Sequence, residues 1–473
     1  MEKPAVDTKL NARYTSLVCA VAALGGLLFG YDWVVIGGAK PFYEAYFHLT
    51  TGEQIGWANS CALLGCLIGS MISGALSDRF GRKSLLLLSA VLFAVSSLLT
   101  GWAPSFSLFA TWRILGGVAI GIASNVSPTY IAEMSPAVWR GRLVSLNQLT
   151  IVIGILLAQI VNLIIAERVP DGATSTMIRA SWNGQTGWRH MFIAVAVPSF
   201  LFFFSSLFVP ESPRWLATKG LEERAIAVFT RIGGAAYAHL AIRNMRTAEH
   251  VEASRNMLPS PNFRRALLIG VALAALQQWS GINILFNYAE EVYRAAGYGV
   301  NDVLFNIVIT GAINLVFTLL ALRVVDNWGR RPLMLFGCAG IAISHLLIGF
   351  GYHLGLTGFP MLLFTLLTIG CYAMSLAPVT WVIISEIFPT QFRGVGVSIS
   401  VSALWVASFL LTFTFPVLRE SLGPSGTFFL YAANCTAGLV FVYLRVPETK
   451  GKSLEQIEEE LNQPARATFV ITK

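Results

Sequence analysis

The charged sequence DRFGRK at residues 78–83 returns in the second half of the chain as DNWGRR at residues 326–331. Other short motifs are duplicated in the same order. They are EMSP with EIFP (133–136 and 386–389), each followed by Arg-Gly (140–141 and 393–394), and PESPR with PETK (210–214 and 447–450). The repeated unit is about half of the protein, which is far longer than the unit of a solenoid. The chain is therefore expected to consist of two similar halves.

Composition places the chain among integral membrane proteins. Hydrophobic residues make up 55% of the 473 residues and charged residues only 12%, whereas average proteins carry roughly 25% charged residues. A helix that crosses a hydrocarbon layer of about 30 Å needs roughly 20 apolar residues. Twelve such stretches lie near residues 14–38, 56–77, 85–103, 107–132, 142–166, 188–209, 266–288, 303–325, 333–353, 359–385, 395–418 and 424–445. We expect an all-α membrane protein with twelve transmembrane helices in two pseudo-symmetric six-helix bundles, with short cytoplasmic helices, as in transporters that rock one half against the other.

Positive charges predict the orientation. Lys and Arg gather in alternate short loops, at 79–83, 140–142, 330–331 and 393. Because basic loops stay on the cytoplasmic side, we expect a multi-pass protein of the cytoplasmic (inner) membrane with both termini inside. The net charge of +8 follows from this bias, and nucleic acid is not expected as a partner, since its readers gather basic residues on one solvent face. The polar start of the chain predicts no cleaved signal peptide.

The repeats and the apolar stretches predict four parts. These are an N-terminal six-helix bundle (1–216), a cytoplasmic helical linker (217–265), a C-terminal six-helix bundle (266–446) and a cytoplasmic tail (447–473). All six cysteines fall inside apolar stretches, and no Cys or His cluster has the spacing of metal ligands. We therefore expect no disulfide framework, no metal site and no cofactor.

Each repeated loop motif combines a carboxylate with nearby arginines at the expected inner edge of the membrane. Ion pairs are less screened there than on an open surface. We expect these pairs to form only when the two halves close on the cytoplasmic side, which would make them a bistable gate for alternating access. The gate candidates are Asp78, Arg82, Glu133, Arg140, Glu211, Arg214, Asp326, Arg330, Glu386, Arg393 and Glu448. The alternative is that they are ordinary cytoplasmic charges with incidental partners.

Four motifs, taken together and in order, carry a resemblance to a known family. They are GALSDRFGRK (74–83), PESPRWL (210–216), QQWSGIN (277–283) and PETKG (447–451). With these motifs the chain resembles the sugar porter family of the major facilitator superfamily along essentially its whole length. Within that family it looks most like the bacterial D-xylose/proton symporters and related glucose transporters. The resemblance implies the major facilitator fold, with two six-helix bundles around a central sugar site.

Amide side chains are an independent reason to expect a sugar. A polyol needs neutral donors and acceptors and an aromatic face, and Asn and Gln provide both kinds of polar group. Gln277, Gln278 and Asn283 are too loosely spaced for one face of a regular helix, but a helix broken near Gly281 would turn all three inward. By resemblance, the other sugar-binding candidates are Gln148, Asn314, Trp381 and Trp405, and we add Phe29 as a second aromatic wall. The alternative is that these amides only hydrogen-bond between helices.

Asp32 and Arg113 are the outstanding ionisable residues of the apolar stretches, where a charge is expensive enough to indicate a role. The resemblance implies that proton-driven sugar porters carry an aspartate at position 32, whereas passive facilitators generally have a neutral residue there. We expect protonation of Asp32 to release Arg113 and permit the sugar-loaded rocking step. A static structural salt bridge is the alternative.

Three positions depart from the family pattern. Leu404 stands where the xylose symporters have a glutamine, and Val195 stands where they have an acidic residue. The first change removes one expected sugar contact and the second weakens the expected proton relay. His345 is a titratable group in an apolar stretch with no counterpart in the family. We expect it to have a packing or interhelical hydrogen-bonding role, and a role in proton transfer is the alternative.

The leading functional expectation is secondary active transport of a monosaccharide, such as D-xylose or D-glucose, by a monomer in the lipid bilayer, coupled to protons through Asp32. A facilitative uniporter and a carrier of another polyol such as inositol are alternatives. A sugar sensor with a transporter fold is a third alternative, although the roughly twenty residues after Lys452 are too few for a signalling domain. An enzyme is disfavoured, because the apolar stretches contain no nucleophile–base pair, metal-ligand set or carboxylate dyad.

Overall fold

The computed structural model describes residues 10–170, 172–253, 261–388, 393–450 and 452. Most of the expected tail and the end of the expected linker, 254–260, therefore lie outside the described residues. The chain divides into two compact units, Met1–Asn256 and Met257–Lys473. The described residues are nearly all helical and include no β-strand, which confirms the all-α prediction.

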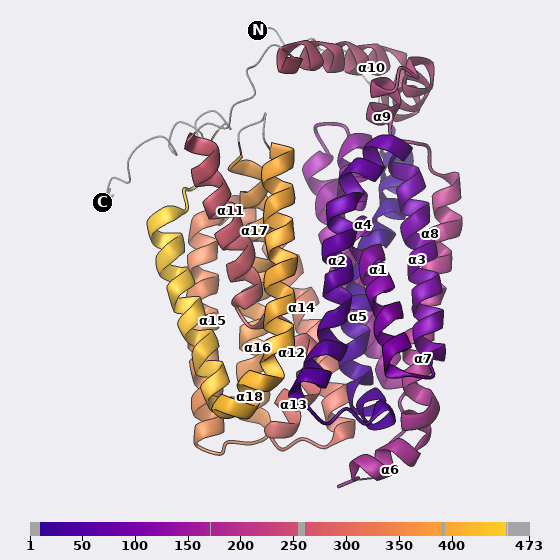
Figure 1. Cartoon of the computed structure of the whole chain (residues 1–473). Helices are drawn as coiled ribbons and strands as arrows, with labels where there is room; N and C mark the ends of the chain where they lie inside the picture. The colour runs from indigo at the N-terminus through magenta and orange to yellow at the C-terminus, as the bar shows by residue number, and fades with distance from the viewer. Residues whose placement is uncertain (1–9, 171, 254–260, 389–392, 451, 453–473) are drawn as a thin grey trace. The chain divides into compact units, whose positions relative to one another are not determined.

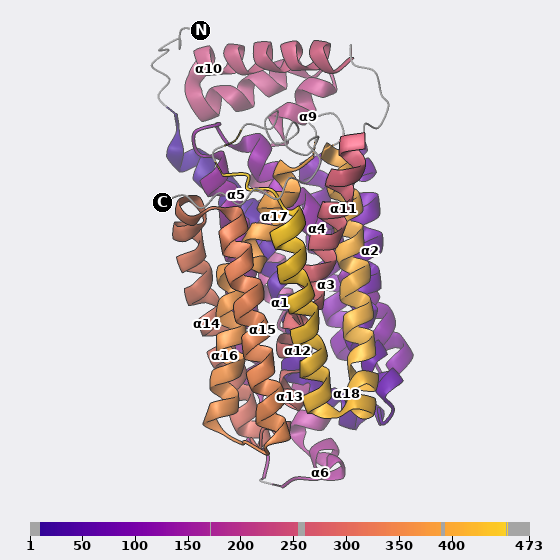
Figure 2. The ribbon, with the colours of Figure 1, turned by 90° about the vertical axis from the view of Figure 1, so that its left-hand side faces the viewer.

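The first unit is a bundle of long apolar helices, and its last two helices lie at one end of that bundle. It contains α1 (Ala12–Phe47), α2 (Gly52–Phe80), α3 (Arg82–Trp102), α4 (Phe106–Met134), α5 (Arg140–Ile165), α6 (Ser175–Ala180), η1 (Asn183–Gly187), α7 (Trp188–Ile193), α8 (Ala196–Phe208), α9 (Pro213–Thr218) and α10 (Glu222–Ala253). Figures 1 and 2 both show α10 lying across the end of this bundle, where the backbone N–H of Asn11 donates to the carbonyl of Ile232 at 2.7 Å. Non-helical backbone at Gly233 and Gly234 divides α10 into two shorter helices.

The second unit repeats the bundle with more interruptions. It contains α11 (Pro261–Trp279), α12 (Ile282–Asn287), α13 (Ala289–Ala295), α14 (Val300–Trp328), α15 (Arg330–His353), α16 (Phe359–Met374), α17 (Leu376–Glu386) and α18 (Arg393–Arg445). At about 1.5 Å per residue, the 53 residues of α18 are too long for one crossing of a layer about 30 Å thick. Non-helical backbone at Gly423 (φ 69°) divides α18 into two arms, and Figure 1 shows it doubling back.

The twelve predicted crossings are present in the described part of the chain, six in each unit. In the first unit they are α1 to α5 and the segment Asn183–Phe208, and in the second they are Phe263–Asn287, α14, α15, Phe359–Glu386 and the two arms of α18. Residues Glu222–Met245 of α10 are also long and apolar enough to cross a membrane, but this helix is bent at its two glycines and lies across the bundle end (Figure 1).

Glycines allow the helices of the first unit to pack backbone against backbone. A methyl group added at Gly65 of α2 would lie 2.0 Å from a carbonyl oxygen of α4, and one added at Gly117 of α4 would lie 1.9 Å from a carbonyl oxygen of α2. Gly30 of α1 and Gly154 of α5 make the same reciprocal contact, at 1.9 and 2.0 Å. Helices in membranes associate through such small residues, which let their backbones pack closely. Lipid chains are as apolar as the helix surfaces, so the hydrophobic effect does not drive the helices together. These contacts hold α1 and α4 in place, and those helices carry the ion pair described below.

The Gly117→Val substitution is expected to lower the melting temperature of the purified protein by roughly 3 °C, because the valine would have to push α2 and α4 apart. Scanning fluorimetry in detergent measures this change. Gly74→Val is the matched control, since a methyl group added at Gly74 of α2 meets nothing within 4 Å. Equal melting temperatures for the two variants would contradict the packing argument.

Candidate functional site

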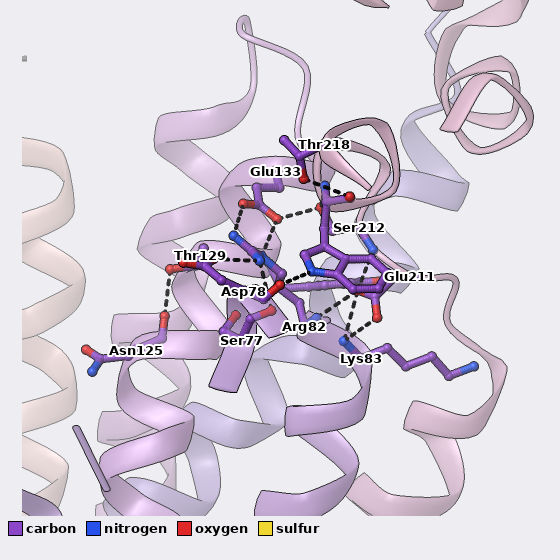
Figure 3. A network of polar contacts seen from close by, with 12 residues as sticks. Ser77, Asp78, Arg82, Lys83, Asn125, Thr129, Glu133, Glu211, Ser212 and Thr218 are labelled. Carbon is purple, nitrogen blue, oxygen red and sulfur yellow. Dashed lines mark hydrogen bonds and ion pairs between the residues drawn. The ribbon is translucent and has the colours of Figure 1, made fainter. Parts of the chain in front are cut away.

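A charged network joins the turn between α2 and α3 to the end of α4 and the start of α9 (Figure 3). Arg82 is its centre. Its Nε and Nη2 donate to the two carboxylate oxygens of Glu133 at 3.0 and 3.1 Å, and its Nη1 lies 3.2 Å from Asp78 Oδ1. The side chains of Arg82 and Glu133 are only 13% and 12% exposed, whereas Asp78 is 77% exposed. The bidentate, shielded pair with Glu133 is therefore the stronger of the two.

Glu211 has a different role, because it binds backbone rather than an arginine side chain. Its Oε1 accepts hydrogen bonds from the backbone N–H groups of Arg82 and Lys83 at 2.9 and 3.1 Å, in the first turn of α3. The first N–H groups of a helix have no partner within the helix, and the helix dipole favours a negative charge there. Gly81, in a left-handed conformation (φ 93°), makes room for the carboxylate, since a methyl group at that position would lie 2.2 Å from it.

The second unit repeats the main contacts of this arrangement. Gly329 is left-handed (φ 95°), and the backbone N–H groups of Arg330 and Arg331 donate to Glu448 at 3.0 and 3.1 Å. Arg330 Nη2 lies 3.5 Å from Glu386 Oε1. The duplicated motifs thus encode one structural device twice, a carboxylate cap on a helix start beside an arginine–glutamate pair.

One prediction about these motifs is wrong. Arg82 pairs with Glu133, and Arg330 with Glu386, inside a single unit, so these pairs do not require the two halves to close on each other. The reason is that each partner comes from a neighbouring helix of the same bundle. Each network therefore ties several helix ends of its own unit together.

The remaining gate candidates are placed less fully. Arg140 is half-buried and Arg214 is exposed, and among the described residues no carboxylate lies within ion-pair distance of either. The side chains of Asp326 and Arg393 lie outside those that the structure describes. A gating role for any of these charges stays a prediction.

The second feature of the first unit is an ion pair buried in the bundle. Arg113 Nη1 of α4 donates to Asp32 Oδ1 of α1 at 2.9 Å, and both side chains are only 3% exposed. Arg113 Nη2 also donates to the backbone carbonyl of Asp32 at 3.3 Å, and the guanidinium carbon lies 5.4 Å from the ring centroid of Phe192. The arginine is thus held by three groups, only one of which is a carboxylate oxygen.

The other carboxylate oxygen of Asp32 has a different environment. Oδ2 is buried, and among the described residues it has no hydrogen-bond partner. A methyl group added at Gly116 would lie 3.2 Å from it, so the glycine leaves space beside this oxygen. Val195, where the family pattern has an acidic residue, is fully buried after α7. The two oxygens of Asp32 thus differ, since Oδ1 binds Arg113 and Oδ2 faces the space beside Gly116.

In the second unit, buried amides surround a broken helix. The helix ends at Trp279 and restarts at Ile282, with left-handed Gly281 (φ 82°) between, which confirms the predicted break. Gln278 Nε2 donates to Gln277 Oε1 at 3.4 Å, and Asn283 Nδ2 donates to Gln278 Oε1 at 2.5 Å. The break thus brings the three predicted amides into one hydrogen-bonded row, the kind of arrangement that can receive a neutral polar ligand.

The neighbours of this row were not predicted. Gln277 Nε2 donates to the carbonyl of Leu376, the first residue of α17, at 3.1 Å, and Asn283 Nδ2 donates to Ser408 Oγ at 3.0 Å. Nothing in the sequence distinguishes Ser408 from the many other serines.

Gln159 of the first unit is a further buried amide that was not predicted, although its position about three helical turns after Gln148 was a signal in the sequence. It is 1% exposed, and neither of its amide atoms has a partner among the described residues.

The other predicted sugar-binding residues are divided between the two units. In the second unit, Asn314 and Trp405 are each 4% exposed and Trp381 is half-buried, and in the first unit Gln148 and Phe29 are half-buried. Leu404, which stands where the family has a glutamine, is 4% exposed. Hydrogen bonds join Gln277, Gln278 and Asn283 directly, and substrate-binding roles for all eight residues stay predictions.

Two similar units of six crossings, with an ion pair inside the membrane and a discontinuous helix beside buried amides, are the construction of a secondary transporter. The fold and the site together define the protein as a multi-pass membrane transporter of this class. The sequence model of the family described as "Sugar (and other) transporter" matches residues 18–461. The chain belongs to this family, as the sequence motifs indicated.

Individual relatives match over nearly the whole chain. The D-xylose-proton symporter of Escherichia coli K12 is 36% identical, covering 96% of this chain and 97% of its own. The arabinose-proton symporter of Bacillus subtilis is 37% identical, covering 94% and 95%. A structure of the E. coli xylose transporter XylE in a partially occluded inward open conformation is similar with a TM-score of 0.83 and 34% identity, covering 93% of this chain and 100% of that one. The major facilitator fold is thereby confirmed.

Proposed function

We propose that this protein carries a monosaccharide across the cytoplasmic membrane together with a proton. The observation that carries the proposal is the buried pair of Asp32 and Arg113, because a charged pair at membrane depth is costly and is retained where it has a role. Relatives named as proton symporters of xylose and arabinose support the same reading. The protein works as a monomer and makes no covalent bond to its substrate.

In this proposal a proton is taken up at Asp32 Oδ2, the carboxylate oxygen that Arg113 does not occupy. Neutralising the carboxylate weakens the charge-assisted hydrogen bond from Arg113 Nη1. Arg113 keeps its bond to the Asp32 carbonyl and its place near the Phe192 ring, so the guanidinium is not left without partners. Protonation thereby loosens α1 from α4 and permits the substrate-loaded rearrangement.

The sugar is recognised by the amide row in the second unit. Its hydroxyl groups need both donors and acceptors, and each amide of Gln277, Gln278 and Asn283 supplies both. Each bond nets only about 0.5–1.5 kcal/mol against water, so several amides have to act together. We further propose that Gln148, Asn314, Phe29, Trp381 and Trp405 complete the site.

Orientation and domain movement belong to the same proposal. The network of Arg82 and the start of α1 lie at the end of the first unit where α10 lies (Figures 1 and 3). Basic loops face the cytoplasm, so this end and both termini are cytoplasmic. The two six-helix units rock as bodies, and the linker at 217–265 joins them on that side.

Uptake of labelled xylose and glucose into proteoliposomes, with and without an inward proton gradient, tests the function. We expect accumulation above equilibrium that requires the gradient. Equilibration without accumulation would make the protein a facilitative uniporter. If neither sugar enters, a competition panel of other monosaccharides and polyols, including inositol, identifies the substrate instead.

Replacing Glu133 by Gln is expected to slow the maximal transport rate about tenfold while leaving substrate affinity within about twofold. The substitution leaves Arg82, 13% exposed, without its main counter-charge, and a tenfold change corresponds to about 1.4 kcal/mol in a barrier. Initial uptake rates give the first quantity, and substrate-dependent tryptophan fluorescence gives the second.

Asp78→Asn is the matched control for this prediction. It removes the other carboxylate that contacts Arg82, but Asp78 is 77% exposed, so the transport rate should stay within about twofold. A loss of substrate affinity in Glu133→Gln, or an equal slowing of transport in Asp78→Asn, would contradict this prediction. Either result would count against a role of the Arg82–Glu133 pair in the rate of rearrangement.

A further inference from the structure

The helix break in the second unit frees a backbone carbonyl inside the membrane. The helix ends at Trp279, the left-handed Gly281 reverses the backbone, and α12 starts at Ile282. The regular helical hydrogen bonds are therefore interrupted around Ser280. Non-helical backbone at this depth is tolerated only where some other group satisfies the freed polar atoms. The carbonyl oxygen of Ser280 therefore needs a donor from another helix.

His345 of α15 is the closer of two donors to this oxygen, and the other is the weakly donating thiol of Cys435, whose Sγ lies 3.8 Å away. The histidine side chain is fully buried, and its Nε2 lies 2.7 Å from the carbonyl oxygen of Ser280. A carbonyl oxygen only accepts hydrogen bonds, so the geometry assigns the hydrogen to Nε2. Nδ1 has no partner among the described residues, and a hydrogen there would be a buried, unsatisfied donor. The imidazole is therefore neutral, with one tautomer.

Aromatic neighbours fix the position of the imidazole ring. Its centroid lies 5.5 Å from that of Phe428 and 5.9 Å from that of Tyr431, both on α18. A methyl group added at Gly281 would lie 3.0 Å from Tyr431 Cδ2 and 3.1 Å from His345 Nε2. The turn is thus held between two rings, and only glycine satisfies both this space and the positive φ.

We propose that His345 is a positioning residue for substrate recognition, acting through the helix break. The inference rests on the proposed function, because it assumes that Asn283 and Gln278 bind the sugar. These two amides lie on opposite sides of the break, and their 2.5 Å hydrogen bond exists only while the turn keeps its geometry. His345 holds that geometry by donating to Ser280, and so keeps Asn283 turned toward Gln278 and Ser408.

Two variants separate the effect on KM of losing the hydrogen bond from the effect of changing the volume of the side chain. His345→Leu removes the donor, whereas His345→Gln keeps an N–H at a similar reach. We expect the leucine variant to raise the KM for sugar exchange about tenfold with a maximal rate within about twofold, which is about 1.4 kcal/mol of lost binding. The glutamine variant should restore KM to within about threefold. His190→Leu is the control, because it removes an imidazole contact with a carbonyl, that of Thr186, at an exposed site in the first unit.

A double-mutant cycle with Asn283→Ala shows whether His345 acts through Asn283. If it does, His345→Leu should raise KM little further in the Asn283→Ala background. The alanine variant has no amide at position 283 whose orientation His345 could maintain. Additive effects on KM would overturn the inference. Should the leucine variant fail to fold, Gly281→Ala disturbs the same turn from the other side and is expected to give the same rise in KM.

The outcomes distinguish this inference from the proposed function. If Asn283→Ala leaves KM unchanged, the amide site itself is wrong. If Asn283→Ala raises KM but His345→Leu and Gly281→Ala do not, only the role of His345 is overturned. Loss of proton-driven accumulation in His345→Gln, with exchange intact, would make the histidine a proton carrier and would also overturn the positioning role.

Discussion

Replacing Asp32 by Asn is expected to abolish proton-driven accumulation of the sugar while exchange of sugar across the membrane persists. Asparagine has nearly the same size, and its carbonyl oxygen can still accept from Arg113 Nη1, but it cannot take up a proton. In the proposed mechanism the proton enters at Oδ2, the oxygen without a partner among the described residues. The accumulation ratio in proteoliposomes with an inward proton gradient should therefore fall to about one, since an uncoupled carrier only equilibrates its substrate.

The control for this experiment is Asp302→Asn, which removes a carboxylate at the exposed start of α14 and should leave accumulation intact. Counterflow exchange, which needs no net proton movement, shows whether the Asp32 variant is folded and binds sugar. Accumulation that survives in Asp32→Asn would mean that another group carries the proton. Loss of exchange together with accumulation would favour the static salt bridge, a purely structural role for Asp32.

Replacing Gln278 by Ala is expected to raise the KM for the sugar about 10- to 100-fold. Gln278 is the middle of the amide row, since its Nε2 donates to Gln277 and its Oε1 accepts from Asn283. Its loss removes one of the proposed contacts to the substrate and leaves Asn283 Nδ2 with Ser408 alone, and a buried polar group that loses a partner costs about 1–3 kcal/mol. Exchange rates measured over a range of sugar concentrations give KM separately from the maximal rate.

Gln54→Ala is the matched control for the second prediction. It deletes an amide of the same kind at the exposed start of α2, where Gln54 accepts from the backbone N–H of Thr50, and KM should not change. An unchanged KM in Gln278→Ala, with normal folding, would favour the alternative that the amides only hydrogen-bond between helices. A lower melting temperature with unchanged KM would point the same way.

Much of the architecture followed from local properties of the sequence. A crossing needs about 20 apolar residues in a row, and such a run is visible without knowledge of its neighbours, so the twelve spans were predicted. The break near Gly281 was predicted for a similar reason, because three amides too loosely spaced for one helical face flank a glycine. The duplicated loop motifs predicted two similar halves, and each motif indeed forms the same network in its own unit.

The partners of the functional side chains were decided only by the tertiary structure. Arg82 meets Glu211 across 129 residues of sequence, and His345 meets Ser280 across 65. Spacing along the chain says nothing about such distances, which is why the ion pairs were wrongly expected between the halves. Composition and apolar runs determine that this chain crosses a membrane twelve times, because burial in lipid depends on each segment alone. Helix packing decides which carboxylate caps the start of α3, which oxygen of Asp32 accepts from Arg113 and which histidine contacts the carbonyl of Ser280. Each of these contacts brings groups from different helices within about 3 Å.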